Sequence, residues 1–254
     1  MTIQTAVILA AGMGTRLKEL GQSRPKGFLR LGKHSIIEES IERLQACGIE
    51  RVIIVTGYKA EFYEQLKLCY PQVTTVHNPH WATSGSMYSL YCARQILNQD
   101  FLLLESDLVY EVRSIEAVLA FPQDNVILLS GHNQAGDEVF VETRGKTIWA
   151  MSKRLEALSQ PPTGELVGIC KISQSLFQRI LIYAKAQFKT TLKVDYETDA
   201  LVTVAQSYPI YYILIPDLLW TEIDDAHHLA RARTHIYPRI ISLNFKRYES
   251  NLQD

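Results

Sequence analysis

The sequence contains only four cysteines, which stand far apart at Cys47, Cys69, Cys92 and Cys170. The absence of a CxxC pair excludes a zinc ribbon and a thioredoxin-type redox site. Isolated cysteines in a chain of 254 residues are typical of small buried side chains in a reducing compartment. We therefore predict a cytoplasmic protein whose cysteines are buried.

The sequence also lacks an excess of charge of either sign and a long apolar run. Its 26 Lys and Arg residues nearly balance 27 Asp and Glu residues, which argues against nucleic-acid binding through the overall field. The apolar run at residues 6–11 is too short to span a membrane, and no basic segment precedes it. We therefore predict no signal peptide, no membrane partner and no nucleic-acid partner. Hydrophobic residues make up 47% of the chain, enough for a sizeable core.

Short β-branched segments alternate with helical periods in the first half of the chain. Ser35 and Glu38 form a capping-box pattern at the start of the first of these helices. Because the predicted strands are apolar throughout, we expect an α/β fold of the Rossmann-like kind, with a mostly parallel central sheet and helices on both faces. The predicted strands cover residues 6–9, 51–56, 73–77 and 101–105, and the helices cover residues 35–44, 62–68 and 86–97.

The pattern changes at about residue 126, where strands follow one another with little helix between them. This change indicates a mixed or antiparallel extension of the sheet, with strands at 126–130, 138–143, 147–152 and 165–171, and helices near 173–187 and 225–235. The strongest chain-breaking segment, Gln160–Gly164, fits a loop. We therefore predict a single domain, residues 1–254, with one half at about 1–125 and another at about 126–240.

A glycine loop follows the first predicted strand directly, in the segment Leu9-Ala10-Ala11-Gly12-Met13-Gly14-Thr15-Arg16. Small residues let the backbone approach a ligand, and successive N–H groups form an anion-binding concavity. The loop lacks the P-loop pattern, and Leu17 stands where a dinucleotide-binding loop has its third glycine. Taken alone, it is equally compatible with a plain turn.

The continuation Arg24-Pro25-Lys26-Gly27 makes the signal specific. LAAGxGTR followed by PK resembles the signature of nucleotidyltransferases, which join a nucleoside triphosphate to a sugar phosphate or small alcohol phosphate. The resemblance implies that Lys26 contacts the α-phosphate and that Arg16 grips the phosphates. It also implies that the loop cradles the triphosphate through Leu9, Ala10, Ala11, Gly12, Gly14 and Thr15. The half at 1–125 would then bind the nucleotide, and the half at 126–240 the acceptor.

Two aspartates from distant parts of the chain are candidates for binding Mg²⁺. Asp107, after Ser106, follows an apolar strand, and Asp224 belongs to the segment Glu222-Ile223-Asp224-Asp225. Each aspartate is also compatible with a helix N-cap, a role that Asp225 fills equally well. The resemblance implies that Asp107 and Asp224 bind magnesium, with Ser106 beside the nucleotide, so the catalytic set would be Lys26, Arg16, Asp107 and Asp224.

Segments Asn78–Leu90, 102–110, 130–139 and 164–168 resemble small cytidylyltransferases, and together they look most like the 2-aminoethylphosphonate cytidylyltransferases. The resemblance implies transfer of CMP from CTP to 2-aminoethylphosphonate, with release of pyrophosphate. It also implies a pyrimidine-reading loop, although the same segment is compatible with a simple loop before a Ser-capped helix. Phosphocholine is an alternative acceptor, and a sugar or inositol phosphate is a less favoured one. The proposed base-reading residues are Thr83, Ser84, Gly85 and Ser86.

An acceptor with an anionic head and an ammonium tail needs cations at one end of its pocket and carboxylates at the other. Lys26 and Lys153 are candidates for the head. Candidates for the tail are Asp137, Glu138, Glu165, Glu197 and Asp199. A trimethylammonium tail would instead favour an aromatic cage, for which Tyr196, Tyr211, Tyr212 and Trp220 are available.

Two other classes of protein are compatible with parts of the pattern. A non-catalytic binding module with the same fold would be expected to lack the lysine or the aspartates, and none is missing. A nicotinamide oxidoreductase would need the third glycine. The sequence gives no oligomeric state, and a homodimer is compatible with it.

Overall fold

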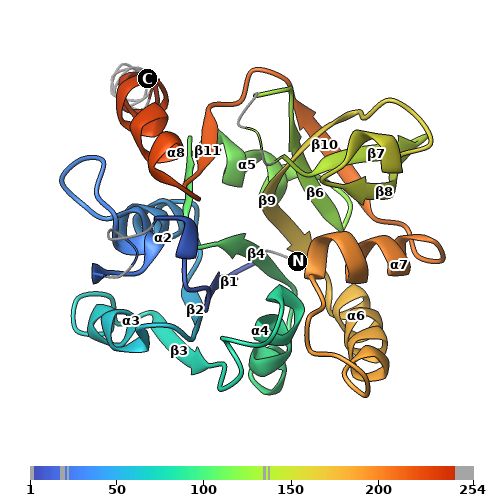
Figure 1. Ribbon diagram of the computed structural model, residues 1–254, viewed down its shortest axis with the longest axis horizontal. Coiled ribbons are helices and arrows are strands. Elements are labelled where there is room, and N and C mark those ends of the chain that lie inside the picture. Colours follow the sequence, from blue (N-terminus) through green and yellow to red (C-terminus); the bar gives the residue numbers. More distant parts are fainter. Residues whose placement is uncertain (1–2, 18–20, 22, 134–135, 137, 244–254) are drawn as a thin grey trace.

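The protein is built around a nine-stranded sheet. Figure 1 shows the computed structural model, which describes residues 3–17, 21, 23–133, 136 and 138–243. The strand order is β3-β2-β1-β4-β9-β6-β10-β8-β7. The strands are β1 (Thr5–Ala10), β2 (Arg51–Thr56), β3 (Val73–His77), β4 (Phe101–Glu105), β6 (Val126–Ser130), β7 (Phe140–Arg144), β8 (Thr147–Ser152), β9 (Gly164–Ile172) and β10 (Tyr211–Ile215). A second sheet pairs β5 (Leu108–Tyr110) with β11 (Trp220–Glu222).

Helices cover both faces of the sheet, as predicted. One face carries α2 (Ile36–Ala46), α3 (Ala60–Leu66) and α5 (Arg113–Ala120), whose apolar side chains share a core with alternate residues of β1 such as Ile8. The opposite face carries α4 (Ser86–Cys92) and α6 (Gln174–Gln187), which lie side by side (Figure 1), together with α7 (Val202–Ala205). Because successive strand residues point to opposite faces, Val7 and Leu9 belong to this second core.

The direction of the strands changes at β9, where the predicted extension begins. β1 to β4 are parallel to one another, whereas β9 runs antiparallel to β4 on one side and to β6 on the other. The start of β9 also pairs with β7, so the sheet curls back on itself in this half. The mixed extension is therefore confirmed, and a single strand carries the sheet from one half of the chain to the other.

The predicted capping box at the start of α2 is present. The Ser35 hydroxyl accepts a hydrogen bond from the Glu38 N–H at 3.4 Å, and the Glu38 carboxylate accepts one from the Ser35 N–H at 2.7 Å. Both bonds satisfy N–H groups that the first turn of a helix leaves without intrahelical partners.

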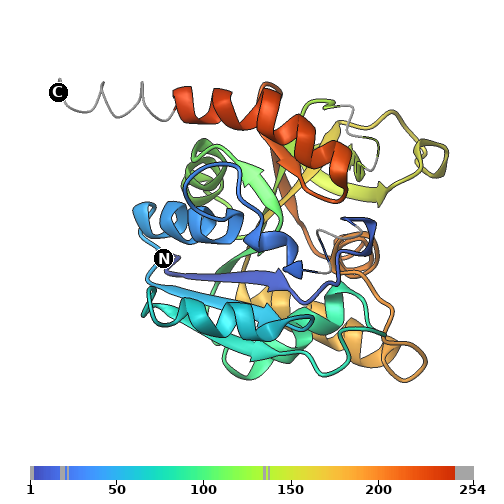
Figure 2. The same ribbon diagram turned by 60° about the vertical axis from the view of Figure 1, so that its left-hand side comes forward.

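The C-terminal helix packs outside the main sheet. It begins as α8 (Ala226–Arg231), passes through a π-helical turn at Ala232–Ile236 and continues to residue 243. Figure 2 shows it running across one end of the molecule. Its buried face, which includes Leu229 and Ile236, forms a small core with Val109 of β5 and Leu219 before β11. No helix among the described residues is both long and apolar enough to cross a membrane.

The expectation that the cysteines are buried holds only for Cys170. Cys69 is exposed, and Cys47 and Cys92 are half-buried. Cys69 follows α3 in a turn at the surface, where a small side chain does not have to be covered.

Candidate active site

The segments that follow β1, β4 and β11 come together at one edge of the main sheet, and they form the site. β1 and β4 are parallel neighbours, with Leu9 opposite Glu105, and the Ser106 N–H donates to the Leu9 carbonyl at 3.1 Å. The glycine loop after β1 and Asp107 after β4 therefore leave the sheet side by side. β11 pairs with β5, and the Ile223 N–H donates to the Asp107 carbonyl at 3.1 Å, which brings Asp224 to the same place.

Lys26 joins the two aspartates that the sequence singled out. Its ammonium lies 2.7 Å from Asp107 Oδ2 and forms a second ion pair with Asp224 Oδ1. The other oxygen of Asp224 lies 2.7 Å from Nη2 of Arg16. Both aspartates are almost fully buried, whereas the Arg16 side chain is about half exposed. Four residues from three separate segments of the chain thus form one connected charge network.

The charge network keeps Lys26 protonated. Burial alone would lower the pKa of the Lys26 ammonium, since a buried charge loses its hydration. The opposite charges of Asp107 and Asp224, and hydrogen bonds to both, outweigh this loss and raise the pKa well above its ordinary value. Lys26 therefore contributes a positive charge to the site.

The glycine loop is shaped to receive Lys26. Gly14 has a φ of +61°, a left-handed conformation that favours glycine, and a Cβ there would lie 2.9 Å from Cγ of Lys26. The backbone N–H groups of Gly12, Met13 and Gly14 donate no hydrogen bond to any residue that the structure describes. Such a run of N–H groups beside a lysine and an arginine is suited to binding an anion.

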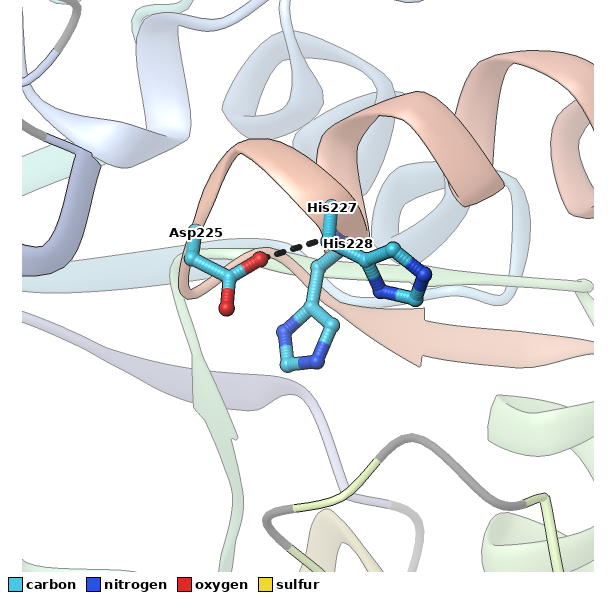
Figure 3. A group of neighbouring side chains, drawn as sticks. All are labelled: Asp225, His227 and His228. Carbon is cyan, nitrogen blue, oxygen red and sulfur yellow. Dashed lines mark hydrogen bonds between the residues drawn. The ribbon is translucent and has the colours of Figure 1, made fainter.

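Asp225, rather than Asp224, caps the helix that follows. Its carboxylate accepts a hydrogen bond from the His228 N–H at 2.8 Å, as Figure 3 shows, and this bond lowers the pKa of Asp225. Asp225, His227 and His228 also bring one possible metal-ligand atom each within 4.8 Å of one another, but the helix cap accounts for the place of the carboxylate. Asp225 therefore has the N-cap role that the sequence left open between these two aspartates, and Asp224 faces Lys26 and Arg16 instead.

An acidic cavity adjoins the charge network. It offers about 110 Å³ of space open to water-sized molecules, and its wall includes four glutamates, one lysine and one tryptophan. Among the described residues that line it, Trp220 is the only aromatic one; its indole N–H is buried and has no hydrogen-bond partner in the described part of the chain. The polar and aromatic lining residues are Glu105, Asn133, Glu138, Lys153, Glu197, Trp220 and Glu222.

Burial, together with the crowding of carboxylates, raises the pKa values of three glutamates in this cavity. Burial, with the charges of Glu197 and Asp107, raises the pKa of Glu105 to about 8. Burial and the charge of Asp195 raise the pKa of Glu197 to about 7, although Ser86 and Lys153 act in the opposite direction. Burial and the charges of its carboxylate neighbours also raise the pKa of Glu222 well above its ordinary value. A cation in this cavity would relieve the repulsion.

The residues present also fit a divalent metal ion. Glu105, Asp107 and Glu222 each bring a carboxylate oxygen within 4.8 Å of the other two, and Asp224 is joined to Asp107 through Lys26. These are hard oxygen donors, the kind that Mg²⁺ prefers.

The other predicted acceptor residues are more widely spread. Glu165 is buried behind the cavity wall and accepts hydrogen bonds from the backbone N–H of Asn133 at 3.0 and 3.1 Å. Tyr196 is fully buried, and its hydroxyl faces Glu105. Asp199 accepts from the Asp195 N–H at 2.8 Å inside its own helical turn, and Asp137 lies outside the described residues.

The predicted base-reading loop has most of its N–H groups occupied. Those of Thr83 and Ser84 donate to the His80 carbonyl, at 2.9 Å each, and that of Gly85 donates to the Leu192 carbonyl at 2.8 Å. The Ser86 N–H and hydroxyl both face Asp195, at 3.4 Å. The hydroxyls of Thr83, Ser84 and Ser86 also have partners, which are the His80 carbonyl, the Asn78 amide and the Tyr196 N–H. A ligand at this loop would therefore meet mainly the remaining lone pairs of oxygen atoms.

Replacing Gly85 with alanine is expected to destabilise the protein by about 1–3 kcal/mol, since a Cβ there would lie 2.3 Å from the Val194 carbonyl oxygen. Thermal unfolding measures the effect. Gly12→Ala is the control, because a Cβ at Gly12 meets nothing within 4 Å. Equal melting temperatures for the two variants would contradict the tight packing of residues 85 and 194.

Glu105, Glu222 and Asn133 are lining residues that the sequence did not single out. Glu105 and Glu222 each stand two positions before a predicted aspartate, Asp107 and Asp224. Side chains two apart on a strand point to the same side, so this spacing was a usable signal. Asn133 carries no comparable signal.

The fold and the site define a nucleotidyltransferase. The MobA-like NTP transferase domain matches residues 6–237, and the chain belongs to this family.

Three curated proteins are similar in sequence to this chain. The chain is 26% identical over 232 residues to CMP-5'-(3-aminopropyl)phosphonate synthase of Streptomyces rubellomurinus, over 87% of this chain and 37% of that protein. It is 35% identical over 105 residues to 2-aminoethylphosphonate cytidylyltransferase of Lancefieldella rimae, over 41% of this chain and 43% of that protein. It is 37% identical over 98 residues to choline-phosphate cytidylyltransferase of Streptococcus pneumoniae, over 39% of this chain and 42% of that protein. Each match covers less than half of the relative.

Solved structures support the fold. The inositol-1-phosphate CTP transferase from T. maritima has a TM-score of 0.81 at 18% identity, covering 94% of this chain and 97% of that one. The CTP:phosphocholine cytidylyltransferase from Streptococcus pneumoniae has a TM-score of 0.72 at 20% identity, covering 92% and 98%. The expected Rossmann-like nucleotidyltransferase fold is confirmed.

Proposed function

We propose that the protein transfers CMP from CTP to 2-aminoethylphosphonate, with release of pyrophosphate, for the synthesis of phosphonate-modified lipids or glycans. The observation that carries this proposal is the acidic cavity beside the network of Lys26, Asp107 and Asp224. A small acceptor placed there would have its anionic end near the phosphate-binding residues and its ammonium among glutamates. A cytoplasmic location and a homodimer remain predictions of the sequence.

The glycine loop, Arg16 and Lys26 would bind the triphosphate. The N–H groups of Gly12, Met13 and Gly14 offer hydrogen bonds to phosphate oxygens, and the two side chains neutralise their charge. At residues 83–86 the N–H groups are mostly occupied, which leaves oxygen atoms to accept from the base. Cytosine donates from its amino group, whereas uracil and thymine present a carbonyl oxygen at the same position, so this loop favours CTP.

In the proposed reaction an oxygen of the acceptor phosphonate forms a bond to the α-phosphorus, and the bond from that phosphorus to the leaving pyrophosphate breaks. The phosphonate is already anionic near neutral pH, so no general base is needed. Catalysis then consists of positioning and charge neutralisation. Lys26 would stabilise the charge on the α-phosphoryl oxygens. A Mg²⁺ ion held by Asp107 and Asp224, when bound, would supply further positive charge there.

The lining of the cavity favours a primary ammonium over a trimethylammonium group. A primary ammonium donates hydrogen bonds to carboxylates, and four glutamates line the cavity. A trimethylammonium group cannot donate and is held by aromatic faces, of which the described lining offers only Trp220. Tyr211 and Tyr212 lie on β10 and do not line it. Phosphocholine remains the second candidate, supported by the relative from Streptococcus pneumoniae.

The test is pyrophosphate release with CTP and Mg²⁺ and each of four acceptors: 2-aminoethylphosphonate, phosphocholine, phosphoethanolamine and glucose 1-phosphate. We expect turnover with the phosphonate, and weaker turnover with phosphoethanolamine, which carries the same ammonium. Preference for phosphocholine would move the tail site to Trp220. Absence of turnover with all four acceptors, and with the other nucleoside triphosphates, would reject the reaction and favour a binding module.

A further inference from the structure

Described residues of the loop after β6 form part of the wall of the acidic cavity. Asn133, Glu138 and Val139 line the cavity, and the loop leaves the sheet at Ser130 beside the start of β9. Three of its residues are not among those that the structure describes, but the described ones make specific contacts on two sides. Asn133 therefore contributes to the wall of the proposed acceptor pocket.

On one side the loop is held by β9. Glu165 accepts hydrogen bonds from the Asn133 N–H through both carboxylate oxygens, at 3.1 and 3.0 Å, and lies 3.2 Å from Nδ1 of His132. Glu165 is almost completely buried, so it is a fixed anchor rather than a mobile surface group. These contacts explain why Glu165, which the sequence predicted to bind the acceptor, lies behind the cavity wall instead.

On the other side the loop is held by the C-terminal helix. Nη2 of Arg231, in α8, donates a hydrogen bond to the Asn133 carbonyl at 2.8 Å. No carboxylate among the described residues forms an ion pair with Arg231, and its other terminal nitrogen, Nη1, is buried without a described partner. The bond to Asn133 is therefore the one specific polar contact that the described residues offer this guanidinium.

The helix that carries Arg231 starts directly after Asp224. Asp225 caps its first turn, and Leu229, Ala232 and Ile236 fix it against β5 and β11. Arg231 therefore joins the segment that presents Asp224 to the charge network with the wall of the neighbouring cavity. We propose that Arg231 is a positioning residue that holds the acceptor wall in place relative to Asp224 and so sets the affinity for the acceptor. This inference rests on the proposed function.

The test compares Arg231→Met, which keeps an unbranched apolar stem and removes the donor, with Arg231→Lys, which keeps a charged donor. For Arg231→Met we expect the KM for the acceptor to rise about tenfold or more, because a hydrogen bond from a charged group is lost. The KM for CTP stays within twofold of wild type, and Arg231→Lys recovers part of the loss. Arg233→Met is the matched control, since Arg233 is exposed and contacts the Arg30 carbonyl instead, at 3.3 Å.

A second measurement does not depend on turnover. In hydrogen–deuterium exchange, Arg231→Met is expected to increase deuterium uptake in a peptide covering residues 131–133 and to leave the peptide of β1 unchanged. An unchanged acceptor KM, an equal rise in both KM values, or unchanged exchange at 131–133 would overturn the proposed role of Arg231. A wild-type protein inactive with every acceptor would instead reject the proposed function, and the exchange result would still decide the role of Arg231.

Discussion

Replacing Lys26 with methionine lowers turnover with CTP by about 10²–10³-fold, the usual cost of removing one preorganised charge contact from a transition state. The expectation follows from the position of the Lys26 ammonium between Asp107 and Asp224, beside the N–H groups of the glycine loop. Pyrophosphate release under saturating substrates measures the effect. Asp107→Asn is expected to be similarly slow.

The same substitution has a structural consequence that serves as an internal check. Without the ammonium, Asp107 and Asp224 face each other as buried charges, which lowers stability. We expect added Mg²⁺ to raise the melting temperature of Lys26→Met more than that of wild type. Lys189→Met, at an exposed position after α6, is the control for the general effect of replacing a lysine with methionine. A kcat like that of wild type in both Lys26→Met and Asp107→Asn would contradict the proposed chemistry.

Replacing Glu197 with glutamine weakens binding of an amine acceptor and stabilises the protein above neutral pH. The pKa of Glu197 is about 7 in the folded protein, against an ordinary value of 4.5. Between these values the folded state holds more protons than the unfolded state, so the free energy of unfolding falls as pH rises through this window. The full loss, up to about 3 kcal/mol, is present above pH 7, and glutamine does not incur it.

Thermal unfolding at pH 5 and pH 8 measures this effect. Glu197→Gln should gain stability relative to wild type at pH 8 and much less at pH 5, while its KM for 2-aminoethylphosphonate rises. Glu156→Gln, at an exposed position, should shift neither quantity. If Glu197→Gln is less stable than wild type at pH 8, the ionised Glu197 carboxylate does not destabilise the folded protein. An unchanged acceptor KM would remove Glu197 from the pocket.

The centre of the site could be predicted because it depends on local rules. Lys26, Asp107 and Asp224 each follow a recognisable motif, and parallel strands deliver the segments after β1 and β4 to one edge of the sheet. The capping box at Ser35 was predictable for the same reason, since its two partners are three residues apart.

The rest of the pocket depends on pairings between distant segments. β9 lies between β4 and β6 and also touches β7, and periodicity alone does not indicate such partners. β5 and β11 have three residues each, too few for a periodic signal, yet they bring Glu222 next to Glu105. Glu165 was singled out by charge alone, whereas its hydrogen bonds to Asn133 place it behind the wall.

The Lys26 bridge also has a thermodynamic consequence. Lys26 and Arg16 form ion pairs with three of the four carboxylate oxygens of Asp107 and Asp224. A metal that binds these oxygens competes with the two cations, and a phosphate that binds the cations competes with the two carboxylates. Each ligand would therefore free the groups that the other one needs, which is positive linkage, and linkage is reciprocal. Mn²⁺ would accordingly bind more tightly in the presence of CTP than in its absence, and CTP would gain by the same factor from Mn²⁺.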